Sequence, residues 1–192
     1  MKKSLFKKFI VTTMAFGIVA TAFSTHSFAS TTSTVQGGTL SGGSMTFTGL
    51  PATLNGTLVK STANWAIGDI TDARGTGEGW NLSLTLTQFK EVDGNGAYVI
   101  GGKSLATNSL KVVGVPTINK KDSTSSDITT ITPVASGTAL DNGSTVKVLS
   151  ASLNGGMGSY TIGNLGVELT IPANAYAKTY KTDATVTINT AP

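Results

Sequence analysis

The 192-residue sequence contains no cysteine, one histidine and one arginine. Without cysteine there can be no disulfide, no cysteine nucleophile and no thiolate metal site. The histidine, His26, lies in an N-terminal segment that we expect to be removed. The mature chain would then also lack the base of a Ser-His-Asp triad and the imidazole ligands of zinc. Carboxylate chemistry remains, but no pair of acidic residues is singled out by the sequence. We therefore predict a protein that is not an enzyme and uses no metal or cofactor.

The N-terminus has the three parts of a secretory signal peptide. Four lysines lie within the first eight residues, an apolar run spans residues 9–23, and Ser27-Phe28-Ala29 places small residues at the −3 and −1 positions of a cleavage site. The apolar run of about 15 residues is shorter than the roughly 20 that a membrane-spanning helix needs. We predict that residues 1–29 are a signal peptide, cleaved after Ala29, and that the mature protein is not held in a membrane.

The mature chain has no excess of either charge. Residues 1–29 contain four of the 14 basic residues and none of the 10 acidic ones, so residues 30–192 have a formal charge of zero. No basic patch indicates nucleic acid or an anionic membrane as a partner. The remaining 163 residues are enough to bury a core without disulfides in one domain.

Helical periodicity is missing after residue 29, and alternation of apolar with polar residues takes its place. The clearest strand is Trp80–Lys90, and Tyr180–Ile188 alternates again near the C-terminus. Shorter strands are expected at 57–59, 64–67 and 97–100, with turn signals between the strands every 8–12 residues or so. We predict an all-β fold, a single antiparallel β-sandwich with Greek-key-like connections over residues 45–192. The Ser-, Thr- and Gly-rich residues 30–44 are predicted to be a flexible lead-in.

Residues 69–79 are rich in glycine and aspartate, which predicts a loop. The only arginine, Arg74, lies there between Asp72 and Glu78. A guanidinium suits an anionic ligand, but it also suits a bidentate ion pair that braces the loop, with Asp72 or Asp69 as the partner. We favour the brace, because an arginine surrounded by acidic residues is less available to an anion. A calcium site made by Asp69, Asp72 and Glu78 lacks a diagnostic spacing.

The two tryptophans each allow two interpretations. Trp80 starts the stripe that continues with Leu82, Leu84 and Leu86, which places it on the core face of a strand. An exposed tryptophan could instead stack on the apolar face of a sugar ring. We favour the core for Trp80 and likewise for Trp65.

Two short motifs carry a family resemblance. The first is Asp72-Ala73-Arg74-Gly75 followed by Gly79-Trp80-Asn81-Leu82, with Phe89 behind it. The second, near the C-terminus, is incomplete: Val186-Thr187-Ile188 occupies the place of a Trp-x-Leu strand. In these motifs the chain resembles the WxL domain family of Gram-positive surface proteins.

The resemblance implies a secreted, β-rich domain at the cell surface that associates non-covalently with the cell wall, through peptidoglycan or another wall polymer. It implies wall-binding or motif residues in the first motif, namely Asp72, Arg74, Gly75, Gly79, Trp80 and Leu82. The positions that correspond to the second motif are Tyr180, Thr185, Val186, Ile188 and Pro192. If the missing tryptophan of that motif mainly packs a core, Val186 is a tolerable smaller β-former.

An alternative function is that of a self-associating structural or matrix protein of the cell surface. Its basis is the Thr- and Gly-rich strands, the zero net charge, and a lead-in that could add as an edge strand to a neighbouring molecule. In that case the partners would be other surface proteins or further copies of this chain.

Overall fold

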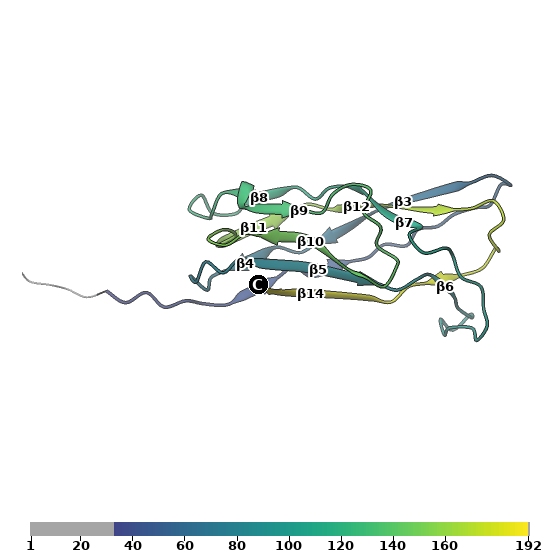
Figure 1. Ribbon diagram of the computed structural model, residues 1–192, viewed down its shortest axis with the longest axis horizontal. Coiled ribbons are helices and arrows are strands. Elements are labelled where there is room, and N and C mark those ends of the chain that lie inside the picture. The colour runs from purple at the N-terminus through teal and green to yellow at the C-terminus, as the bar shows by residue number, and fades with distance from the viewer. Residues whose placement is uncertain (1–32, 192) are drawn as a thin grey trace, which may run out of the picture. The chain divides into compact units, whose positions relative to one another are not determined.

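The computed structural model describes residues 33–191, and the predicted signal peptide and Pro192 lie outside them. The described residues form short strands and one 3-10 helix, joined by turns and loops (Figure 1). The elements are β1 (Leu40–Gly42), β2 (Met45–Thr46), β3 (Val59–Ile67), β4 (Ile70–Asp72), β5 (Trp80–Leu86), β6 (Lys90–Glu91), β7 (Leu110–Gly114), β8 (Ile118–Lys120), η1 (Ile128–Thr130), β9 (Ile131–Pro133), β10 (Thr145–Ala151), β11 (Gly158–Ile162), β12 (Leu165–Ile171), β13 (Tyr180–Lys181) and β14 (Ala184–Thr190). No helix in this described part is long and apolar enough to cross a membrane.

One layer of the fold is a four-stranded antiparallel sheet in the order β14-β5-β10-β9. The strand predicted most clearly from sequence, β5, lies inside this sheet, and its whole length pairs with β14. On its other side β5 pairs with β10, where the register shifts between Lys147 and Leu149. The C-terminal strand β14 therefore covers one side of the strand that begins with Trp80.

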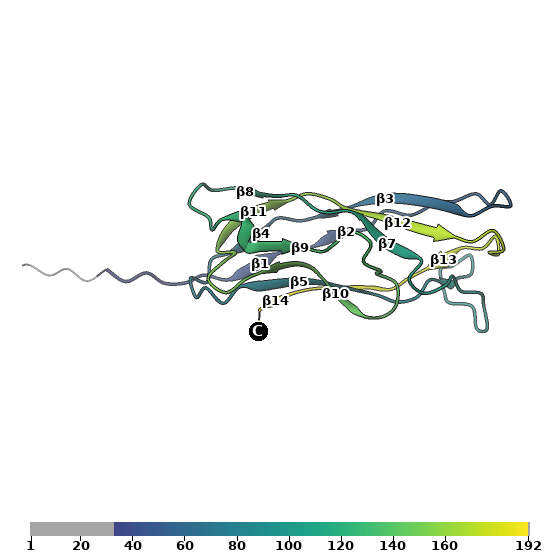
Figure 2. The same cartoon turned by 45° about the horizontal axis from the view of Figure 1, so that its top comes forward.

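The second layer is one bent sheet whose two halves have the strand orders β1-β4-β11-β8 and β2-β3-β12-β7. Strands β3 and β4 are consecutive and separated by two residues, and β11 and β12 are related in the same way. The pairing register is the same before and after these two-residue breaks. Trp65 of β3 pairs with Leu165 of β12, and Ile70 of β4 pairs with Tyr160 of β11. Figure 2 shows this layer lying over β5, β10 and β14. The predicted antiparallel β-sandwich is confirmed.

The core lies between the two layers. Alternate residues of β5 point inward and are at most 1% exposed, as the period-2 pattern predicted: Trp80, Leu82, Leu84 and Leu86. They belong to one apolar cluster with residues of the bent sheet, among them Ile70, Tyr160, Leu165 and Val167. Burial of this apolar surface is the main stabilising contribution in a chain without disulfides.

Several predicted strand boundaries were wrong. Of the strand predicted at 57–59 only Val59 is in a strand, and it belongs with 64–67 to the single strand β3, while Trp80–Lys90 is interrupted after Leu86. The predicted strand at 97–100 makes only an isolated bridge, between Val92 and Tyr98. Tyr180–Ile188 divides into β13 and β14, because β13 pairs with β6 whereas β14 pairs with β5. In each case pairing with a distant strand, which a local pattern does not contain, decides where a strand ends.

Two segments predicted to be irregular contain strands. The loop prediction for residues 69–79 was wrong at Ile70–Asp72, since these residues form β4 between β1 and β11, with Ile70 fully buried. Within the predicted lead-in, Leu40–Gly42 forms β1 and pairs with β4. The loop therefore begins at Ala73, and the residues just before β2 are part of the sheet. The other predicted domain boundaries stay predictions.

Candidate functional site

The loop between β4 and β5 is organised by Arg74. Its Nε atom donates to Asp72 Oδ1 at 2.9 Å, and its Nη2 atom donates to Asp72 Oδ2 at 2.8 Å. The Asp72 side chain is 1% exposed and that of Arg74 is 13% exposed, so the pair is largely removed from water. The prediction that Arg74 braces the loop through a bidentate pair with Asp72 is confirmed. Asp69, the other partner considered, is paired with Lys121 instead.

The remaining donors of Arg74 connect the loop to the C-terminal strand. Nη2 also donates to the Gly79 carbonyl at 2.8 Å, and Nη1 donates to Thr190 Oγ1 at 2.7 Å and to Glu78 Oε2 at 3.4 Å. A guanidinium has five N–H donors, and these contacts together with the two to Asp72 account for all of them. The side chain therefore has no free donor for an anionic ligand.

Trp80 lies under this loop in the core. Its ring is fully buried, and Nε1 donates to the Gly156 carbonyl at 2.9 Å. A Cβ atom on Gly156 would lie 2.6 Å from Nε1, so only glycine lets this carbonyl approach the indole. Trp80 cannot stack on a sugar in this arrangement. The core interpretation is confirmed for Trp80, and also for Trp65, which is 3% exposed.

The two glycines of the first motif have structural roles. Gly79 has a φ of +72°, and a Cβ there would lie 2.4 Å from the Ala151 carbonyl oxygen. Gly75 has a φ of +70° in open space, so only its backbone conformation calls for glycine. Together with fully buried Leu82, these residues shape the turn that leads into β5. In this structure the first motif serves the fold.

The described residues of the second motif lie in two different strands, β13 and β14. Val186 pairs with Leu84 and Ile188 with Leu82, and both are half-buried against the core. This position supports the view that a side chain at 186 serves packing. Thr185 is exposed beside Thr85, whereas Tyr180 lies in β13, next to a groove described below. A direct wall-binding role of either motif remains a prediction.

Among the described residues no group of three or more acidic side chains is arranged to hold a metal ion. At the calcium site considered for Asp69, Asp72 and Glu78, the Asp72 carboxylate is taken up by Arg74 and that of Asp69 by Lys121.

The Asp72 carboxyl should make stability sensitive to acid. Burial is the largest influence and raises its pKa, but the hydrogen bonds from the Arg74 side chain and backbone together with the Arg74 charge outweigh burial, and the net pKa is lowered. A carboxyl with a lowered pKa in the folded state stabilises that state above its unfolded pKa, near 3.8, and this contribution is lost as the pH falls through the folded pKa. We expect the free energy of unfolding to decline below about pH 4.

Urea denaturation of the wild type and of Asp72→Asn over a pH series would measure this contribution. The variant should be less stable at neutral pH and lose less stability on acidification. It should not become independent of pH, because the pKa values of Asp69, Glu91, Asp122 and Asp127 are lowered as well. Equal losses on acidification in the two proteins would contradict the assignment to Asp72.

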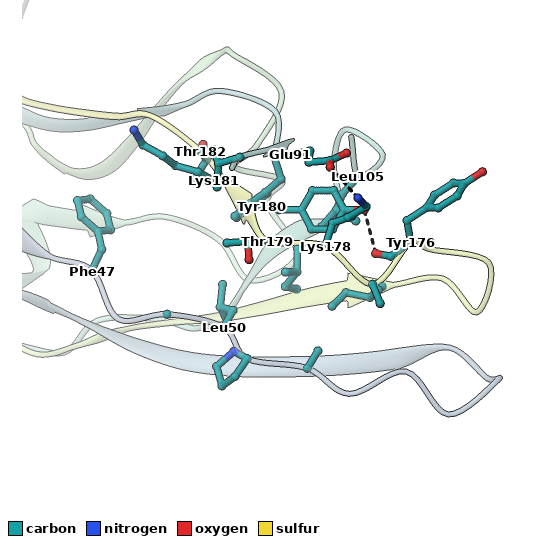
Figure 3. A pocket seen from close by; sticks show the side chains of 18 of the residues that line it. Phe47, Leu50, Glu91, Leu105, Tyr176, Lys178, Thr179, Tyr180, Lys181 and Thr182 are labelled. Carbon is teal, nitrogen blue, oxygen red and sulfur yellow. Dashed lines mark hydrogen bonds and ion pairs between the residues drawn. The ribbon is translucent and has the colours of Figure 1, made fainter. Parts of the chain in front are cut away.

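A groove that sequence reasoning missed lies elsewhere on the same unit. It has a volume of about 1410 Å³ and is bordered by residues 47–54 between β2 and β3, by residues 91–94, and by residues 176–182 around β13. Figure 3 shows Phe47 at one end and Tyr176 at the other, with Leu50 and Tyr180 between them. The three border segments are far apart in sequence, and of the motif positions only Tyr180 lies among them, so it is the fold that brings them together.

Both sides of this groove are held in place by side-chain contacts. On one side Trp65 Nε1 donates to the Thr48 carbonyl at 3.0 Å, and the Phe47 ring packs edge-on against Trp65. On the other side the Tyr180 hydroxyl donates to the Tyr176 carbonyl at 3.0 Å, and Lys178 forms a 3.0 Å ion pair with Glu91.

Glu91 is the centre of the polar contacts at this end. The backbone N–H of Lys103 and then the Lys178 side chain donate to its carboxylate, which lowers the pKa of Glu91. The Lys103 ammonium lies 4.4 Å from the centre of the Tyr176 ring, a cation–π distance. The groove therefore combines apolar and aromatic surface with the ion pair of Lys178 and Glu91 and with the Asp93 carboxylate, which accepts from backbone N–H groups.

Comparison with known proteins gives one result. A family model described as WxL domain surface cell wall-binding matches residues 11–192, nearly the whole chain. Searches of curated proteins and of solved structures give no significant match.

Proposed function

Because this chain belongs to the WxL domain family of surface proteins that bind the cell wall, we propose that it is an exported, non-catalytic protein that holds non-covalently to peptidoglycan. The family places the protein at the cell surface in association with the wall. The single observation that carries the proposal is the extent of the family match, which includes all the described strands. The signal-peptide pattern of residues 1–29 supports export.

Sedimentation with purified wall would test retention. We expect the full mature chain, starting at Ser30, to pellet with peptidoglycan sacculi and to stay in the supernatant without them. A chaotrope should release it intact, because no covalent bond is formed. Recovery of the folded protein in the supernatant despite excess sacculi would overturn the proposal.

The same samples test the absence of catalysis. We expect no soluble sugar or peptide fragments to be released from sacculi during long incubation with the protein. Release of new reducing ends or new amino groups above the level of a sample without protein would show that the protein cleaves the wall.

A further inference from the structure

We propose that the groove between residues 47–54 and residues 176–182 is the surface that contacts the wall, and that its occupant is a glycan strand. This inference depends on the proposed function, because it assigns a site to the wall binding. The first argument is that the main side chains of the first motif are unavailable: Trp80 is fully buried and the donors of Arg74 are all engaged. Contacts with a polymer have to come from other residues.

The dimensions of the groove favour a polymer. Its volume of about 1410 Å³ exceeds the range of about 300–1,000 Å³ that is typical of small-molecule sites. Phe47 and Tyr176, at its two ends, are 39% and 57% exposed, although aromatic rings of this size usually lie in a core or an interface. Aromatic surface at both ends of an open groove suits a chain of rings that pass along it, since the C–H face of a pyranose is apolar.

The charges of the groove favour a neutral occupant. Of the four charged residues that border it in the described part of the chain, Lys178 is paired with Glu91 at 3.0 Å, and Lys181 lies 3.8 Å from Asp183, just outside the border. The fourth, Asp93, is a carboxylate that accepts hydrogen bonds from backbone N–H groups of its own turn. A site for a polyanion such as a phosphate-rich wall polymer would present unpaired cations. Here each of the two border lysines has a carboxylate beside it, so the described residues of the groove present no unpaired cation. Such a surface suits the uncharged hydroxyl and amide groups of a glycan.

The groove is also preorganised. The 47–54 side is anchored by the hydrogen bond of Trp65 to the Thr48 carbonyl and by that of Ser61 Oγ to the Pro51 carbonyl at 2.7 Å. The opposite side is anchored through Tyr180 and Glu91. Binding therefore requires little ordering of the protein, which favours affinity.

The test compares variants of the full mature chain in binding to intact sacculi and to peptide-free glycan strands prepared from them, with the freed lactyl carboxylates amidated so that the strands are uncharged. Wild-type protein should bind both. The double variant Phe47→Ala/Tyr176→Ala should bind each at least about tenfold more weakly, the loss expected when exposed aromatic contacts are truncated at an interface. Leu153→Ala, which removes a 73% exposed apolar side chain outside the groove, is the matched control and should bind like the wild type. Thermal melts establish that each variant is folded.

The possible outcomes separate the site from the function. If wild-type protein binds sacculi and the folded double variant binds them equally well, the groove assignment is overturned and the proposed function stands. If wild-type protein binds sacculi but neither binds glycan strands nor is displaced by them, the glycan is the wrong occupant. Light scattering that shows oligomers of the wild type and monomers of the double variant would make a second copy of the chain the occupant instead. If wild-type protein does not bind sacculi, the proposed function fails and this inference fails with it.

Discussion

Replacement of Arg74 by methionine is expected to lower the free energy of unfolding by about 3–5 kcal/mol, the typical cost of removing one partner of a buried ion pair. Methionine keeps most of the side-chain volume but none of the five N–H donors. The Asp72 carboxylate, with a side chain that is 1% exposed, would be left buried without its counter-charge. The Gly79 carbonyl and the Thr190 hydroxyl would also lose a donor. Urea denaturation at neutral pH measures the change.

Two control variants separate this effect from a general loss of positive charge. Lys60→Met breaks the ion pair with Glu168 in which the lysine side chain is 58% exposed, so it should cost no more than about 1 kcal/mol. The double variant Asp72→Asn/Arg74→Met removes both charges and should cost less than the sum of the two single changes, because no unpaired carboxylate remains. An Arg74→Met variant as stable as Lys60→Met would show that the brace contributes little.

The sequence was most informative where local pattern and burial coincide. Alternation in β5 predicted which side chains face the core, because side chains of a strand point to opposite faces in turn. The pairing of Arg74 followed from the carboxylates nearby in the sequence, and Asp72, two residues away, is the partner observed. Both features depend on neighbours within a few residues. The fold class followed for the same reason, since the frequent turns and short strands are local.

What could not be predicted depends on contacts between distant segments. Strand β4 is only three residues long and lies among glycine and aspartate, so its pairing with β1 and β11 leaves no periodic signal. The continuation of register from β3-β12 into β4-β11 depends on how two pairs of strands from distant parts of the chain align. The groove is the clearest case, because its borders come from residues 47–54, 91–94 and 176–182. The exposure of Tyr176 is visible only after these segments are placed together.

The motif and the groove together suggest a division of roles along the chain. The first motif lies where the β4–β5 loop meets the end of β14: Arg74 bonds to Gly79 and Thr190, and the N–H of Ala191 donates to the Gly79 carbonyl at 3.2 Å. These contacts connect the first and last parts of the domain. A residue that fixes the fold in this way can identify a family without touching its ligand.

Replacement of Trp80 by alanine should test this division, with an expected loss of about 3–5 kcal/mol in the free energy of unfolding. The ring is fully buried in the cluster between the layers, so truncation removes apolar contacts and leaves a cavity. The Gly156 carbonyl would lose its donor as well. Chemical denaturation monitored by circular dichroism measures the loss.

The milder variant Trp80→Phe keeps an aromatic ring but cannot donate to the Gly156 carbonyl, so it should cost about 1–3 kcal/mol and still fold. Under conditions where it is folded, it should bind sacculi as the wild type does, because in the folded state the indole is not accessible to a ligand. The Phe47→Ala/Tyr176→Ala variant should show the opposite behaviour: it should lose less stability than Trp80→Ala, because both rings are partly exposed, and bind sacculi at least about tenfold more weakly. Loss of wall binding in Trp80→Phe under conditions where it is folded would contradict this division and would give the Trp80 indole a role in binding.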